Sequence, residues 1–426
     1  MRILLMFSFY ITLLSCNKED LNPGSSSANP NILLIIADDL GKDAISGYME
    51  GTIKPNTPNI DKFRLEGLQF NNLWVNPVCT PTRASIITGR YGYRTGVKGV
   101  GDELDASENI IHKFVKEETQ GDYATAIVGK WHLSGNNDAK APESFGLDYY
   151  AGLLRGGVPD YYNYQLTQNG VEALATDYVT EKLTDLAIDW INAQDKSWFL
   201  WLAYNAPHTP FHVPPSEMHA QGDLPEYENG MNAMPYFMAA IEAMDYQIGR
   251  LVSEMPTEEL ENTVILFIGD NGSPNQVAQD PYSNSKAKGS LYQGGINVPM
   301  FAYGKGVSRR GEDDNLICST DFYSTIAELA GVQIQEIHDS KSFKKLLSSE
   351  GDHRAFQYSD KGDGTVDEWC LSNGEFKLFQ SSDDNEEFYD LRDDPFENDD
   401  LSNSVLDAEQ EAVKNILLEE LNAIRN

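Results

Sequence analysis

Basic residues are scarce in this chain. Its 426 residues include 32 lysines and arginines against 66 aspartates and glutamates, which gives a formal net charge of −34. Binding to nucleic acid needs clustered cationic side chains that neutralise phosphates, so the composition argues against a nucleic-acid partner. Because an anionic substrate is also a poor match for such a protein, any anion site must be a local cationic pocket.

Long apolar runs are also lacking. The mean hydropathy of −0.43 excludes a polytopic membrane protein. The apolar run at residues 3–14 is too short to span a bilayer and is typical of a signal-peptide core. The sequence Leu13-Leu14-Ser15-Cys16 resembles a bacterial lipobox, and the segment Asn17-Lys18-Glu19-Asp20 resembles the acidic tag that some Gram-negative bacteria use to place lipoproteins on the cell surface.

These N-terminal features predict three successive roles for residues 1–30. We expect a lipoprotein signal peptide at 1–15, a lipidated Cys16, and a flexible tether over 16–30, where Gly24 and three serines lie. The protein would then be a lipoprotein of the bacterial cell envelope, periplasmic or at the cell surface, which contacts the membrane only through Cys16. An ordinary secretory signal with an incidental cysteine is the alternative.

Cysteine is rare as well, with four residues in the chain: Cys16, Cys79, Cys318 and Cys370. If Cys16 carries lipid and Cys79 is catalytic, two remain. Cys318 and Cys370 either pair in an oxidising compartment or stay as buried thiols, and their spacing does not decide between these outcomes.

The apolar and aromatic content, 41% and 11%, is ordinary for a globular protein with a sizeable core. Apolar, strand-like runs lie at 32–37, 68–75, 123–128, 198–204, 263–268 and 298–303, and several of them are continuously apolar, as in strands covered on both faces. Helical patterns between them include a start at Thr57-Pro58 and long stretches at 171–194 and 236–255. This alternation predicts one α/β domain over 31–335.

The pattern changes beyond that domain. Short strand-like pieces at 355–359, 368–371, 376–379 and 387–389 predict a small antiparallel sheet, and 405–424 has the spacing of an amphipathic helix. We therefore expect a small C-terminal α+β subdomain over 336–426.

Potentially reactive residues follow the predicted strands. In open α/β sheets ligands bind at the carboxyl ends of the strands, so five segments that are distant in sequence are expected to meet at one rim. Any one of them alone has an ordinary structural explanation, but together they favour a site. The residues are Asp38 and Asp39, Cys79, Lys130 and His132, His208, and Asp270 and Asn271.

The segment Cys79-Thr80-Pro81-Thr82-Arg83 resembles the Cys-x-Pro-x-Arg signature of type I, formylglycine-dependent sulfatases in the alkaline phosphatase-like superfamily. Other stretches resemble that family in the expected order along almost the whole chain. They are Asp38-Asp39-Leu40-Gly41, Thr57-Pro58-Asn59-Ile60-Asp61, Gly129-Lys130-Trp131-His132, Ala206-Pro207-His208-Thr209-Pro210, Gly269-Asp270-Asn271-Gly272, the lysine segment from Lys288 to Gly295, and Phe388-Tyr389-Asp390-Leu391 with Asp394-Pro395-Phe396-Glu397. Gln293 departs from the family, which usually has a glutamate there; the glutamine keeps the shape of that side chain, without its charge, near the segment that carries Lys288.

The resemblance implies a mixed central sheet flanked by helices, with the small C-terminal sheet beside it. It also implies that a separate maturation enzyme, formylglycine-generating or equivalent, oxidises Cys79 to formylglycine, whose hydrate attacks sulfur and forms a covalent sulfo-enzyme. One calcium ion would be held by residue 79 and by oxygen ligands from Asp38, Asp39, Asp270 and Asn271, hard donors that suit calcium better than zinc.

The resemblance assigns roles to the remaining residues as well. Arg83 would hold the nucleophile and the metal ligands, and Lys130 and Lys288 would bind sulfate. His132 would take a proton from the second hydroxyl of the hydrated formylglycine, which expels sulfate. His208 would protonate the leaving oxygen.

The expected substrate is a sulfated carbohydrate, since an envelope-anchored bacterial sulfatase suits glycan breakdown. The alternatives are a phosphoester or phosphonate hydrolase of the same superfamily, or a protein that only binds sulfated glycan if Cys79 stays unmodified. An aromatic-rich stretch either stacks on a sugar or packs in the core: Tyr149, Tyr150, Arg155, Tyr161, Tyr162 and Tyr164. For His212 a surface role and substrate contact are both open.

Overall fold

The computed structural model describes residues 29–135, 138–362, 367–381 and 385–426. The predicted signal peptide and the lipidated Cys16 lie outside the described residues. None of the helices in the described part of the chain is both long enough and apolar enough to cross a membrane.

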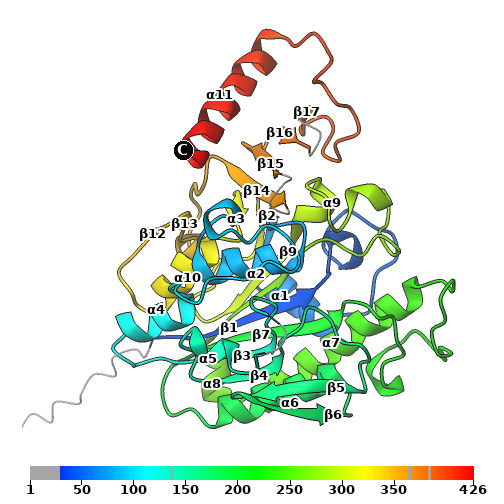
Figure 1. The fold of residues 1–426 in the computed structure, drawn as a ribbon, viewed down its shortest axis with the longest axis vertical. Coiled ribbons are helices and arrows are strands. Elements are labelled where there is room, and N and C mark those ends of the chain that lie inside the picture. Colours follow the sequence, from blue (N-terminus) through cyan, green and yellow to red (C-terminus); the bar gives the residue numbers. More distant parts are fainter. Residues whose placement is uncertain (1–28, 136–137, 363–366, 382–384) are drawn as a thin grey trace, which may run out of the picture.

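A large mixed sheet forms the centre of the molecule (Figure 1). Its described strands lie in the order β10-β2-β9-β8-β1-β7-β3-β4-β5-β6, with β11 beside β2. The strands β8, β1, β7, β3 and β4 run parallel, whereas β9 is antiparallel to both β8 and β2. Their bounds are β1 Asn31–Asp38, β2 Leu68–Trp74, β3 Ala124–Lys130, β4 Tyr150–Leu153, β5 Tyr164–Gln168, β6 Val171–Ala175, β7 Trp198–Pro207, β8 Thr263–Gly269, β9 Asn297–Gly304, β10 Gly311–Asp313 and β11 Ile317–Cys318.

Helices cover both faces of this sheet, so successive residues of the central strands are buried in different cores. Ile32, Leu34 and Ile36 of β1 pack in a core with residues of α2, α4 and α10. Leu33 and Ile35 pack in a second core with residues of α1, α6 and α7. The helices are α1 Pro58–Glu66, α2 Cys79–Thr88, α3 Gly92–Thr95, α4 Ile111–Glu118, α5 Ala141–Ser144, α6 Val179–Asn192, α7 Met234–Glu254, α8 Thr257–Glu261, α9 Gln293–Ile296, α10 Asp321–Leu329 and α11 Ala408–Arg425, with short 3-10 turns η1 Lys42–Ala44, η2 Ser216–Met218, η3 Asn284–Lys286 and η4 Lys344–Leu347. The predicted mixed α/β architecture is confirmed.

One predicted helix is wrong at its start. The stretch 171–194 has a helical spacing of apolar residues, but Val171–Ala175 forms strand β6, which pairs antiparallel with β5, and the helix begins at Val179. Asn169 and Gly170 join the two strands with φ angles of 45° and 74°. This Asn-Gly pair suits the left-handed turn of a two-residue hairpin and was the signal for a strand pair.

A second, antiparallel sheet and the last helix form the C-terminal part, as predicted, and lie at one end of the central sheet (Figure 1). A capping box between Asp407 and Gln410 fixes the start of α11. The predicted boundary at residue 335 stays a prediction; Phe343, Leu346 and Leu347 still pack in the central core. The strands are β12 Glu336–Ile337 and β13 Ser340–Lys341, which form a small hairpin, and β14 Gln357–Gly362, β15 Asp367–Ser372, β16 Phe376–Gln380 and β17 Glu386–Asp390, which form the sheet.

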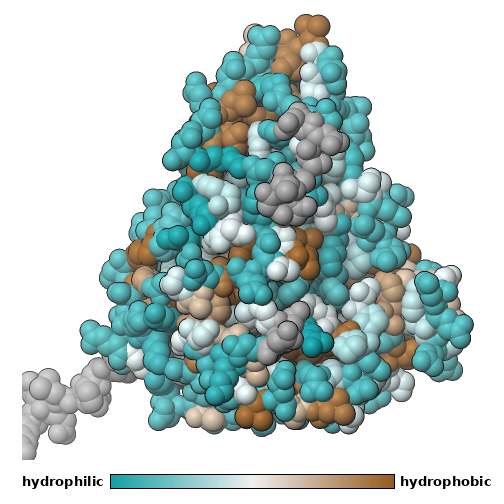
Figure 2. All heavy atoms as spheres, viewed as in Figure 1, coloured by the Kyte–Doolittle hydropathy of each residue, from teal (hydrophilic) through white to brown (hydrophobic). Residues whose placement is uncertain are grey.

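The three described cysteines, Cys79, Cys318 and Cys370, are buried free thiols, which decides the open question about the last two. On the outside, hydrophilic residues cover most of the face drawn in Figure 2, and apolar residues appear in small separate groups. This surface agrees with the acidic composition.

A buried ion pair joins the C-terminal sheet to the segment that carries Lys288. Lys377 on β16 and Glu397 are both at most 1% exposed and contact each other. The second carboxylate oxygen of Glu397 accepts a hydrogen bond from the backbone N–H of Gln293 at 2.7 Å. Lys361 on β14 donates to the carbonyl of Gly289 at 2.9 Å. The lysine segment is therefore fixed from outside the central sheet.

We predict that Glu397→Ala lowers the free energy of unfolding by about 3–5 kcal/mol, because it leaves the Lys377 ammonium buried with the Leu291 carbonyl but without an anionic partner. Urea denaturation followed by circular dichroism measures the loss. The double variant Lys377→Met with Glu397→Leu should recover most of the stability, since an apolar pair replaces the charges. An equal loss in both variants would contradict this account of the pair.

Candidate active site

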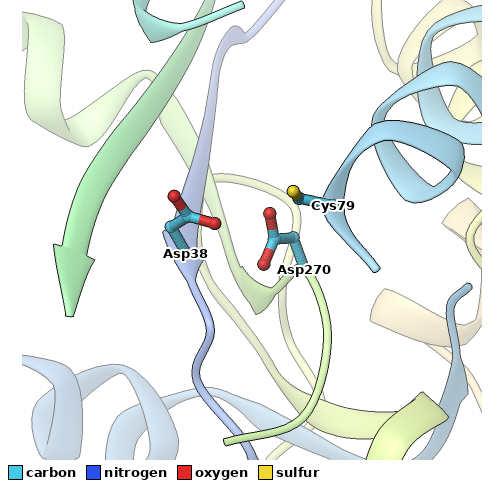
Figure 3. Close-up of side chains that lie close together, drawn as sticks. All are labelled: Asp38, Cys79 and Asp270. Carbon is cyan, nitrogen blue, oxygen red and sulfur yellow. The ribbon is translucent and has the colours of Figure 1, made fainter. Parts of the chain in front are cut away.

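Neighbouring parallel strands deliver charged side chains to one edge of the sheet. Asp38 ends β1, Lys130 ends β3, and Asp270 and His208 directly follow β8 and β7. Because these four strands are adjacent and parallel, their carboxyl ends meet. Figure 3 shows Asp38 and Asp270 pointing toward Cys79, which comes from a different layer of the fold.

Cys79 is the first residue of α2, a helix in which every residue is buried. Val78 before it is extended and provides no side-chain cap, so backbone amides of the first turn are left to favour a nearby anion. Potential ligand atoms of Cys79, Asp38 and Asp270 all lie within 4.8 Å of one another. Burial raises the pKa of the Cys79 thiol, so the unmodified side chain is a weak nucleophile.

Each carboxylate of the site meets a cation from another element. Lys130 donates to Asp38 at 2.8 and 2.9 Å, and both side chains are fully buried. Arg83 donates to Asp270 at 2.8 Å and to the carbonyl of Lys130 at 3.0 Å. Its guanidinium thus connects α2 to the ends of β8 and β3.

The third pair lies closer to solvent. Lys288 is 2.6 Å from the Asp39 carboxylate, and the lysine side chain is 22% exposed. Burial would raise the pKa of Asp39, but Lys288, His208 and Lys130 together hold it below its ordinary value. For Asp38 burial prevails over Lys130 and raises the pKa to about 6.

The donor set fits a hard divalent cation. Asn271 donates its amide N–H to Asp39 at 2.8 Å, while its Oδ1 is buried and has no hydrogen-bond partner among the described residues. A buried amide oxygen without a donor is costly, and a metal ion would satisfy it. With Asp38, Asp39 and Asp270 it makes a set of oxygen donors of the kind calcium prefers.

Backbone strain occurs at two residues of the site. Asp39 and His132 have φ angles of 69° and 56°, in a region that residues other than glycine rarely adopt. The Asp39 N–H donates to Asp270 Oδ1 at 3.0 Å, which fixes the orientation of the turn between the two acids. Such strain persists only where the surroundings determine the conformation.

The two histidines lie next to different members of the site, His132 beside Cys79 and His208 beside Asp39. His132 Nδ1 is 3.3 Å from Cys79 Sγ, and burial, aided by Lys130 and Arg83, lowers the pKa of His132 to about 2. His208 Nδ1 is 2.6 Å from the Thr209 carbonyl, so this nitrogen donates, and Nε2 faces Asp39 Oδ2 at 3.7 Å. His132 is therefore a neutral base next to residue 79, whereas His208 lies toward the solvent side.

The structure thus brings all ten predicted site residues into one cluster. It also adds Thr80, whose Oγ1 is 3.2 and 3.3 Å from the two ring nitrogens of His132. No sequence signal separates this threonine from any other. Gly156 is a second addition, because a Cβ there would lie 2.2 Å from the His132 ring. The Gly156-Gly157 pair was a visible signal for such a close approach.

The aromatic-rich stretch is mostly core. Tyr150, Tyr161 and Tyr164 are at most 2% exposed, whereas Tyr162 is 38% exposed. His212 stacks on Tyr161 with ring centroids 3.6 Å apart. His212 is packed on Tyr161 and stays partly exposed, so a surface role and substrate contact both stay open.

Comparison with known proteins agrees with this geometry. The family model described as Sulfatase matches residues 30–332, and the model of the C-terminal region of N-sulphoglucosamine sulphohydrolase matches residues 286–426. The uncharacterized sulfatase YdeN of Escherichia coli K12 is 29% identical over 73% of this chain, and mouse arylsulfatase J is 28% identical over 73%. The matched regions span 64% and 54% of these two relatives, so the chain covers less than two thirds of their length.

Solved structures share the fold. Ps i-CgsB in complex with k-i-k-neocarrahexaose is 25% identical and superposes with a TM-score of 0.76, covering 93% of this chain and 92% of that one. BT4656, solved with its substrate D-glucosamine-2-N,6-O-disulfate, is 20% identical with a TM-score of 0.75, over 93% and 97% of the two chains. The chain belongs to the sulfatase family, within the alkaline phosphatase-like superfamily.

Proposed function

We propose that this protein hydrolyses sulfate monoesters of carbohydrates at residue 79, with Cys79 converted to formylglycine by a maturation enzyme and one calcium ion bound beside it. The observation that carries the proposal is the position of Cys79. It lies at an uncapped helix start, next to His132 and within 4.8 Å of two carboxylates.

The charges of the site favour an anionic ester despite the acidic protein around them. Three carboxylates face three cationic side chains, so these groups balance in formal charge. The carboxylates, the Asn271 oxygen and residue 79 would hold calcium. The ion then supplies the excess positive charge that offsets the ester, and hydrated formylglycine supplies a hydroxyl nucleophile.

The remaining side chains have separate tasks. Lys130 contacts Asp38 and Lys288 contacts Asp39, and there their ammonium groups can also bind sulfate oxygens. His132 is positioned to take a proton from residue 79 when sulfate is released. His208 contacts the Thr209 carbonyl through Nδ1, so its Nε2 is positioned to protonate the leaving oxygen.

The carbohydrate part of the proposal is supported by the relatives. Ps i-CgsB was solved with k-i-k-neocarrahexaose, and a dog relative that is 26% identical over 75% of this chain is an N-acetylgalactosamine-6-sulfatase, of which 66% is covered. We also propose attachment to the bacterial cell envelope through Cys16, on the strength of the N-terminal sequence alone.

We predict that the purified, matured protein hydrolyses 4-nitrophenyl sulfate with a higher kcat/KM than 4-nitrophenyl phosphate. Lys288→Ala should lower kcat/KM for the sulfate ~10²–10³-fold, the loss typical of one removed charge-stabilising donor. The exposed Lys305 provides a matched control, and Lys305→Ala should keep full activity. Preference for the phosphate ester would favour the phosphoester hydrolase alternative.

A second prediction concerns the metal. Calcium at 100 times its dissociation constant should stabilise the fold by about 2.7 kcal/mol, seen as a higher melting temperature that chelation reverses. Asp270→Asn should abolish this shift and the calcium found by elemental analysis, while Asp393→Ala, at an exposed aspartate, should keep both. Stoichiometric zinc in place of calcium, or full activity after chelation, would count against the site.

A further inference from the structure

An aromatic groove of about 540 Å³ opens beside the candidate active site. Two segments form its walls, one before β5 and one after β7. The first contributes Pro159, Asp160, Tyr161 and Tyr162, and the second contributes Pro210, Phe211, His212, Val213, Leu224, Glu226 and Tyr227.

The first wall continues directly from the catalytic histidines. A Cβ at Gly156 would lie 2.2 Å from the His132 ring, and one at Gly157 would lie 3.3 Å from His208 Cε1. The chain then enters the groove at Pro159. Tyr161 donates a hydrogen bond to the His208 carbonyl at 2.6 Å, which fixes this wall to the second histidine. The wall of the groove therefore begins next to both histidines of the candidate site.

The rings of the groove are held in place before any ligand arrives. The Tyr162 hydroxyl donates to the Val213 carbonyl at 2.9 Å and so bridges the two walls. Phe211 and Tyr227 pack edge to face with centroids 5.3 Å apart. Pre-positioned aromatic faces reduce the entropy lost on binding.

The chemistry of the lining selects a neutral, hydroxyl-rich ligand. The apolar rings suit the carbon face of a sugar, and the carboxylates of Asp160 and Glu226 can accept hydrogen bonds from hydroxyls. None of the described lining residues is a lysine or arginine. Burial lowers the pKa of His212 to about 4, so this residue adds no positive charge at neutral pH. A sulfate in the groove would meet two like charges and no cation.

We propose that the aromatic groove binds an unsulfated sugar ring next to the ring whose sulfate is removed, and that it rejects a neighbour that carries its own sulfate. This inference rests on the proposed function and restricts its range of substrates. The protein would act on singly sulfated units of an oligosaccharide rather than on runs of sulfated units.

The test compares substrates that differ only beyond the reacting ring. A panel of galactose, fucose and glucosamine disaccharides is prepared with one sulfate, and each member also with a second sulfate on the neighbouring ring. The matching sulfated monosaccharides and 4-nitrophenyl sulfate complete the set. For the best panel member, kcat/KM should exceed that of its monosaccharide and fall when the second sulfate is added.

Variants then tie the preference to the groove. Tyr162→Ala and Tyr227→Ala should each lower the ratio of disaccharide to 4-nitrophenyl sulfate kcat/KM about 3- to 10-fold, the effect of one aromatic contact. Tyr162→Phe keeps the ring and should retain most of the ratio. Tyr246→Ala removes an exposed tyrosine of α7 outside the groove and should leave the ratio unchanged. The double variant Asp160→Asn with Glu226→Gln should reduce the penalty of the second sulfate about 2- to 5-fold.

The possible failures are separable. Hydrolysis of 4-nitrophenyl sulfate with no gain from a neutral neighbouring ring, or an unchanged ratio in Tyr162→Ala and Tyr227→Ala, would overturn the groove proposal alone. No hydrolysis of any sulfate ester by the matured protein would overturn the proposed function, and the groove proposal with it.

Discussion

The site depends on buried ion pairs at the edge of the sheet where the carboxyl ends of the strands meet. Asp38, Asp270, Arg83 and Lys130 are at most 1% exposed, and an isolated ion at such a depth is strongly unfavourable. Each of these buried charges is stabilised by an oppositely charged partner from another element. The meeting of four parallel strand ends with the start of α2 is therefore a condition for stable folding and, at the same time, the geometry of the site.

This arrangement also explains how a chain of net charge −34 can hold an anion. The surface is acidic, but in the cleft the carboxylates are engaged by lysines and an arginine, so a bound divalent cation leaves a local positive charge. The C-terminal sheet takes part, because Glu397 and Lys361 hold the segment that positions Lys288. Glu397 accepts a hydrogen bond from the backbone N–H of Gln293, the residue at which the sequence departs from the family pattern.

The strands, and the meeting of the reactive residues at one edge of the sheet, were predicted from the sequence because both depend on local signals. Continuous apolar runs marked the buried strands, and the reactive residues directly followed them. Val171–Ala175 was misread because its apolar spacing also suits a helix, and only the pairing with β5 decides. The contact of Thr80 with His132 and that of Glu397 with Gln293 could not be predicted, since each joins segments that are distant in sequence. Of the aromatic groove, the sequence indicated only Tyr161 and Tyr162, because the second wall comes from a distant segment.

The central claim is that the clustered side chains support catalysis by a formylglycine at residue 79. Mass spectrometry of the peptide containing this residue tests that claim most directly. In active wild-type protein the account predicts the mass of formylglycine in place of cysteine. His132→Ala, incubated with 4-nitrophenyl sulfate, should release a burst of nitrophenol and retain one sulfate on that peptide, because the base beside residue 79 is missing. Fully active protein that carries only unmodified Cys79, with no sulfate retained in the variant, would contradict the account.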